Sequence, residues 1–164
     1  MDSLSYPEIP GYLSEQIARI RPSTDSGIKY RPCKVTLADG AILERVYLVE
    51  AGSYIRHWGV WPSEDRGKTE VLLTEIALVE ESPHRLPARF ANSIYEAGES
   101  CMGGCLFSVR FSSGLVEHFE SGNAVDFIRF PVGLGPDDVE AVTPHAQADN
   151  ARISPDYSWC LYRR

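Results

Sequence analysis

Short runs of β-forming residues, separated by turns that contain glycine, fill most of the chain after residue 27. Residues 33–37 alternate between the two faces of a strand, the turn 38–40 follows, and 42–49 is a longer run of β-formers. The same order of strand, turn and strand recurs between residues 106 and 120. A chain with this pattern buries its apolar side chains in hairpins and meanders, so we predict a β-dominated α+β fold.

Two short helices are also predicted, one before the strands and one between the two blocks of strands. In the first, predicted at 11–20, apolar residues recur at helical spacing, and the proline that follows cannot donate the next helical hydrogen bond. The second is predicted at 87–98, where proline suits the first position and glycine the end. Further strands are predicted at 54–58, 71–73, 76–79, 125–130 and 139–142.

The two blocks of strands repeat the same order of signals. Residues 35–40 align with 109–114, and the run 76–79 before Ser-Pro-His aligns with 139–142 before Thr-Pro-His. Either a duplication or the common order of any two β-meanders explains this. We predict two tandem small β-meander or barrel-like units with an N-terminal helix and a connecting helix. The predicted parts are 1–27 (helix and linker), 28–84 (first β-unit), 85–104 (connecting helix and glycine-rich loop), 105–145 (second β-unit) and 146–164 (a C-terminal segment packing on the body).

Acidic residues outnumber basic ones, because 16 Lys and Arg stand against 23 Asp and Glu and the net charge is −7. Nucleic-acid binders normally present a basic surface, so we expect no nucleic-acid partner. An acidic surface either maintains solubility or attracts a basic protein partner. The chain lacks both a long apolar run and a signal-peptide pattern, so we expect no membrane contact and a cytoplasmic location.

Cys101 and Cys105 form the most closely spaced pair of potential metal ligands. A structural zinc site usually takes two such pairs, whereas the remaining cysteines, Cys33 and Cys160, and the four histidines are scattered. We therefore expect no metal and no cofactor. In a reducing compartment the four cysteines are expected to be free thiols.

His118, Glu120 and Asp126 flank a predicted turn at 122–123. A histidine and a carboxylate paired across a hairpin can act as general acid and base, which makes a small hydrolase-type enzyme the alternative function. The loop length decides whether His118 faces Phe127 or Asp126, and the sequence leaves this register open. A solvent-facing strand explains the same residues without catalysis.

Tyr54, Trp58 and Trp61 precede a charged loop that contains Glu64 and Asp65. Aromatic side chains with a polar tip are favoured anchors at interfaces, so these five residues are the candidate partner-binding site. The alternative is that the aromatic residues fill a core. With no convergent catalytic set in the sequence, we predict a non-catalytic acidic protein-binding or regulatory protein.

The C-terminal segment carries Tyr157, Trp159 and Leu161, which alternate as in a strand. A free tail does not normally carry such residues, so we expect the segment to be ordered. It docks either on its own chain or on another copy, and the second case would produce a homo-oligomer.

Overall fold

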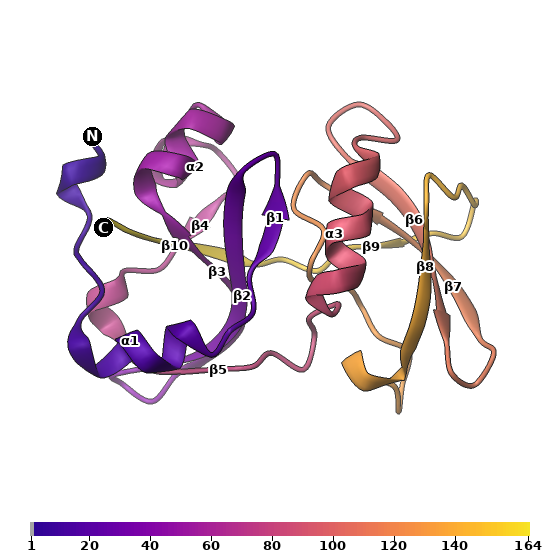
Figure 1. The fold of residues 1–164 in the computed structure, drawn as a ribbon, viewed down its shortest axis with the longest axis horizontal. Coiled ribbons are helices and arrows are strands. Elements are labelled where there is room, and N and C mark those ends of the chain that lie inside the picture. Colours follow the sequence, from indigo (N-terminus) through magenta and orange to yellow (C-terminus); the bar gives the residue numbers. More distant parts are fainter. Residues whose placement is uncertain (1) are drawn as a thin grey trace. The chain divides into compact units, whose positions relative to one another are not determined.

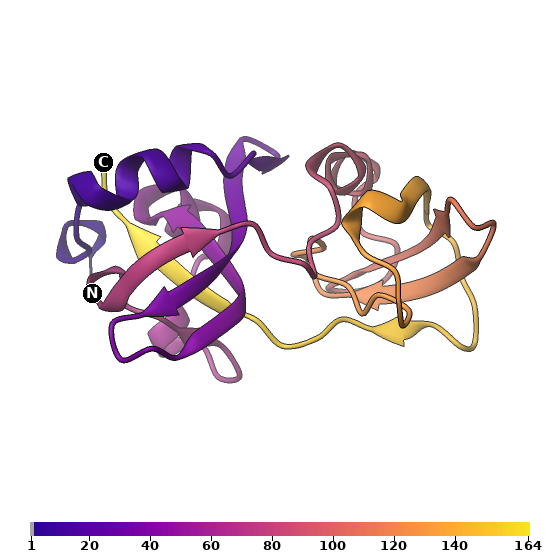
Figure 2. The ribbon, with the colours of Figure 1, turned by 90° about the horizontal axis from the view of Figure 1, so that it is seen from below.

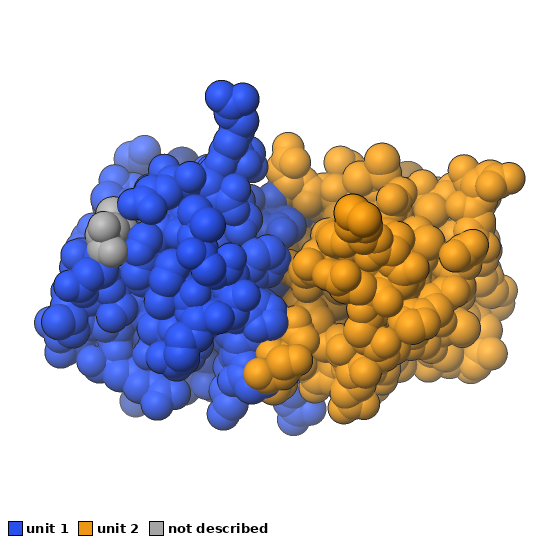
Figure 3. Space-filling view, turned by 90° about the horizontal axis from the view of Figure 1, so that it is seen from above, with its two compact units in different colours: residues 1–22, 27–82, 157–164 blue, residues 23–26, 83–156 orange. Residues whose placement is uncertain are grey.

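The computed structural model describes residues 2–164, and these form two compact units, each with its own sheet (Figure 3). The described part of unit 1 comprises residues 2–22, 27–82 and 157–164, and unit 2 comprises 23–26 and 83–156. Strands predominate over helices in both units, which confirms the predicted β-dominated α+β fold. Both sheets have free edges in the described chain, so neither unit closes as a barrel.

The sheet of unit 1 contains the C-terminal segment as an internal strand. β2 (Ile28–Leu37) and β3 (Ile42–Glu50) form an antiparallel hairpin, and β5 (Ile76–Glu80) pairs antiparallel with β2. β10 (Ser158–Tyr162) runs parallel to both of its neighbours, β3 and β4 (Thr69–Glu70), and lies between them (Figure 1). Segments from the start, middle and end of the sequence therefore meet in one sheet.

Helix α1 (Gly11–Ala18) packs against β5 in unit 1 (Figure 2). The Tyr12 hydroxyl donates a hydrogen bond to the Ile76 carbonyl at 2.7 Å, and the Val79 N–H donates to Gln16 Oε1 at 2.8 Å. These bonds attach the helix to the strand at both ends of β5, while the apolar face of the helix covers the core.

The predicted strand at 54–58 is wrong, because these residues belong to helix α2 (Ala51–Trp58). The side chain of Glu50 caps the helix by accepting a first-turn N–H at 2.6 Å, and Gly59 ends it with a left-handed φ of 80°. Its two aromatic residues are four positions apart. That spacing puts side chains on one face of a strand and also on one face of a helix, so it did not separate the two structures.

Unit 2 is built on a sheet with the strand order β8-β6-β7-β9. β6 (Cys105–Phe111) and β7 (Val116–Ser121) form the hairpin, β8 (Val139–Pro144) pairs antiparallel with β6, and β9 (Arg152–Ile153) pairs parallel with β7. Helix α3 (Ala88–Ala97) packs against β8. The remaining short elements are β1 (Ser23–Asp25), which belongs to unit 2, and the 3-10 turns Ser3–Ser5, Pro62–Glu64, Leu73–Glu75 and Pro136–Asp138.

The two units share one topology. Each has a hairpin, a third strand antiparallel to the first hairpin strand, and a C-terminal strand parallel to the second. A 3-10 turn comes directly before the third strand in both. Equivalent backbone hydrogen bonds of 2.8 Å surround the hairpin turns: Leu37 N to Ala41 O, Ala38 N to Glu75 O, Phe111 N to Leu115 O, and Ser112 N to Asp138 O. Helix α2 has no counterpart in the described part of unit 2.

Two other predicted strands are also wrong. At 71–73 the chain leaves β4 and enters a 3-10 turn. At 125–130 it forms no ladder, and only Phe127 makes an isolated bridge, to Arg85. Five successive residues at 124–128 are buried, so the alternation of inward and outward side chains that defines a half-buried strand is lost there.

Candidate functional site

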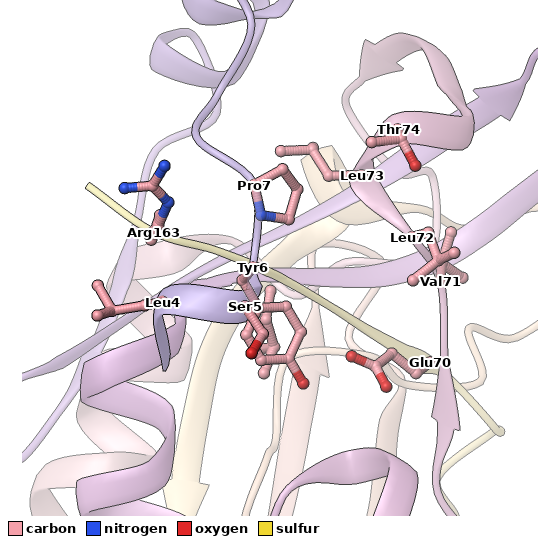
Figure 4. A pocket seen from close by; sticks show the side chains of 11 residues that line it. Leu4, Ser5, Tyr6, Pro7, Glu70, Val71, Leu72, Leu73, Thr74 and Arg163 are labelled. Atoms are coloured by element: carbon pink, nitrogen blue, oxygen red, sulfur yellow. The ribbon is translucent and has the colours of Figure 1, made fainter. Parts of the chain in front are cut away.

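A cavity of about 440 Å³ lies in unit 1 beside the edge of β10 (Figure 4). Its lining comes from residues 4–7, from residues 70–74, and from Leu161 and Arg163. Apolar side chains form most of this lining, and a few polar groups lie among them. That composition is typical of sites that bind small molecules or the side chains of a partner.

Main-chain hydrogen bonds hold the lining segments in place. Val71 N–H donates to the Trp159 carbonyl at 2.8 Å, and Arg163 N–H donates to the Pro7 carbonyl at 2.9 Å. Residues 70–74 and 4–7 are thereby joined to β10 and to the residue directly after it.

The Tyr6 hydroxyl and the Glu70 carboxylate turn toward each other (Figure 4). Burial, and then the neighbouring Glu70 carboxylate, raise the pKa of Tyr6 above its ordinary value. The hydroxyl has no hydrogen-bond partner with good geometry among residues 2–164. Because Tyr6 stays neutral near physiological pH, Glu70 supplies the negative charge of this part of the cavity.

The rim of the cavity combines exposed apolar side chains with one compensated cation. Leu4 is 74% exposed and Leu72 is 53% exposed. Arg163 forms an ion pair with Glu8 at 3.2 Å, so its charge is already balanced. Glu70 makes no ion pair within the described chain. The site can therefore accept an apolar group together with a cation.

The predicted partner-binding aromatic residues lie mainly inside unit 1. Tyr54 and Trp61 are buried and Trp58 is half-buried. The ring of Trp159 lies 5.0 Å from that of Tyr54 and 5.2 Å from that of Trp58, and Trp61 lies 5.3 Å from Tyr6. Contacts of this kind favour the alternative interpretation, in which the aromatic side chains fill the core.

The charged loop that carries Glu64 and Asp65 is tied to α2 by a lysine of its own. Lys68 Nζ lies 2.8 Å from the Asp65 carboxylate, donates to the Tyr54 hydroxyl at 3.1 Å, and sits 4.1 Å above the Trp58 ring. Glu64 is exposed. Because Lys68 already occupies the site formed by the acid and the aromatic rings, a cation from a partner has no place there.

Asp126 is completely buried in a hydrogen-bond network of unit 2. Ser23 Oγ donates to its carboxylate at 2.5 Å, and the Tyr95 hydroxyl donates to its other oxygen. Arg85, which is 5% exposed, donates to Ser23 Oγ at 3.1 Å. The network connects four separate segments of unit 2, and its location in the interior favours a structural role.

The structure does not join the three residues of the acid–base alternative. His118 lies in β7 opposite Ser108 of β6, and within residues 2–164 it makes no hydrogen bond or ion pair to Asp126. Glu120 is exposed on β7. The predicted hairpin between His118 and Asp126 is absent because residues 125–130 form no strand. Neither predicted register is therefore found.

The four cysteines are not joined in disulfides. Burial raises the pKa of Cys105 to about 11, so its thiol stays protonated near neutral pH. No cluster of three or more His, Cys, Asp or Glu side chains within residues 2–164 is arranged to hold a metal. The four thiols are free, namely Cys33, Cys101, Cys105 and Cys160.

None of the helices formed by residues 2–164 has the length and hydropathy needed to cross a membrane.

Comparison of the chain with protein-family models, with curated proteins and with solved structures gives no match. The candidate site therefore rests on the geometry of this chain. Sequence reasoning missed the cavity because its parts, residues 4–7, 70–74 and 161–163, come together only through the pairing of β10. The alternation at 157–161 indicated a strand but not which strands it would join.

Proposed function

We propose that this protein is a non-catalytic acidic protein-binding or regulatory protein whose cavity beside β10 receives part of a partner protein. The observation that carries this proposal is the rim, where the exposed side chains of Leu4 and Leu72 flank the Glu70 carboxylate. Burying a leucine side chain at an interface contributes about 1.5–3 kcal/mol. The net charge of −7 supports a partner with a basic surface.

The hydrolase alternative has less support. General acid–base catalysis needs side chains within hydrogen-bond reach of a common reacting atom. Asp126 is instead enclosed by Ser23 and Tyr95, and His118 makes no contact with it. Binding without chemistry accounts for the cavity and for its exposed apolar rim.

Replacing Leu72 with Asp is expected to reduce the capture of partner proteins by about tenfold, because it removes an exposed apolar side chain from the rim. The captured proteins are quantified by mass spectrometry after incubation of immobilised wild type and variant with cell extract. Leu78→Asp is the matched control, since Leu78 is a 39% exposed leucine of β5 that does not line the cavity. Equal capture by the two variants and the wild type would show that the cavity is not the binding site.

A further inference from the structure

We infer that the cavity takes a lysine or arginine side chain from the partner, with the cation bound at Glu70 beside Tyr6. This inference rests on the proposed function and specifies its ligand. It commits to a cationic side chain, whereas a purely apolar side chain or an acidic one would be a different outcome of the test.

Of the two charged groups that line the cavity, the acidic one has no ion-pair partner. No cation of the described chain pairs with the Glu70 carboxylate. Arg163 forms an ion pair with Glu8, its backbone N–H donates to the Pro7 carbonyl, and its Nε has no hydrogen-bond partner among residues 2–164. A ligand that complements the Glu70 carboxylate carries positive charge and donates hydrogen bonds.

The same unit contains a site of related composition that is already filled by a lysine. Lys68 lies between the Asp65 carboxylate, the Tyr54 hydroxyl and the ring of Trp58. The loop that holds Lys68 leads directly into β4, which carries Glu70. The filled site shows that this combination of groups holds a lysine ammonium in this protein.

At the cavity, the corresponding groups are the Glu70 carboxylate and the Tyr6 hydroxyl, and both residues line it. No cation of the described chain pairs with Glu70 there. A carboxylate and a tyrosine hydroxyl therefore occur together twice in unit 1, once with a lysine of the same chain and once without one.

The apolar lining suits the rest of a basic side chain. Lysine and arginine bury their methylene groups along apolar surface while the charged end meets a polar partner. Val71 and Leu72 are next to Glu70 in the lining and supply such a surface. The exposed rim at Leu4 and Leu72 can contact the residues that flank the basic one in the partner.

The probes are three fluorescent seven-residue peptides of alternating valine and threonine whose central residue is lysine, methionine or glutamate. We expect the wild type to bind the lysine peptide about tenfold more tightly than the methionine peptide and to bind the glutamate peptide most weakly, as measured by fluorescence anisotropy. Glu70→Gln is expected to abolish the lysine preference. Glu80→Gln, an exposed glutamate of β5 outside the cavity, is expected to keep it.

Three results would overturn the inference: no binding of any peptide, equal binding of the lysine and methionine peptides to the wild type, or a lysine preference that survives in Glu70→Gln. Thermal melting of both variants checks that each is folded. Loss of partner capture in Leu72→Asp together with any of these results would leave the proposed function standing and remove only the cationic ligand. Capture that is insensitive to Leu72→Asp would remove the proposed function itself.

Discussion

Removal of residues 156–164 is expected to leave unit 1 unable to fold stably. This deletion removes β10, the strand between β3 and β4, together with the fully buried Trp159 and Cys160. Loss of a buried tryptophan side chain alone costs about 3–5 kcal/mol, and the whole domain is stabilised by only about 5–15 kcal/mol. Circular dichroism during heating should show that the transition of unit 1 is lost or occurs at a much lower temperature.

Two point variants separate the effect of β10 from that of shortening the chain. Trp159→Ala is expected to lower the free energy of unfolding of unit 1 by about 3–5 kcal/mol. Ile153→Ala in β9, where the side chain is 68% exposed, is expected to change stability by less than about 0.5 kcal/mol. A truncated protein that melts like the full chain would show that β10 is not needed for the fold of unit 1.

The second large effect is expected for Asp126→Ala, which should destabilise unit 2 by about 3–5 kcal/mol. The substitution removes the acceptor of the Ser23 and Tyr95 hydroxyls, and it takes away the negative charge of the network to which the buried guanidinium of Arg85 belongs. Urea denaturation, monitored through a spectroscopic signal that arises in unit 2, measures the change in the free energy of unfolding of that unit.

Asp126→Asn and Asp137→Ala are the controls for this substitution. The asparagine variant would keep an acceptor oxygen without the charge, so an intermediate loss is expected. Asp137 is exposed in the turn before β8, and its loss should change stability by less than about 0.5 kcal/mol. Unchanged stability in Asp126→Ala would mean that the network is not structural, and the acid–base hypothesis for Asp126 would regain support.

Local signals predicted the hairpins of both units. Gly40 and Gly114 have φ values of 91° and 92°, a conformation that favours glycine, and each closes the turn that the sequence indicated. The helices α1 and α3 were also predictable, because apolar spacing and flanking proline or glycine define them within a short window. The sequence therefore predicted the hairpins and helices, which residues close together in the chain determine.

Features that depend on distant residues were not recovered. The Asp126 side chain points into the interior, where it binds Ser23, a residue 103 positions away in the sequence. The sequence pattern at 125–130 therefore contained no sign of this orientation. In the sequence, Tyr54 and Asp65 are typical of an interface. The structure shows that both already contact the Lys68 ammonium of the same chain. The cavity depends in the same way on β10.

Amide chemical shifts recorded during a titration with the lysine peptide test the cavity as the binding site most directly. We expect the largest changes at residues 4–7, 70–74 and 161–163, which line the cavity or adjoin it, and much smaller changes in the same titration of Glu70→Gln. Changes confined to the charged loop at 61–68 or to unit 2, with residues 70–74 unaffected, would contradict binding at the cavity.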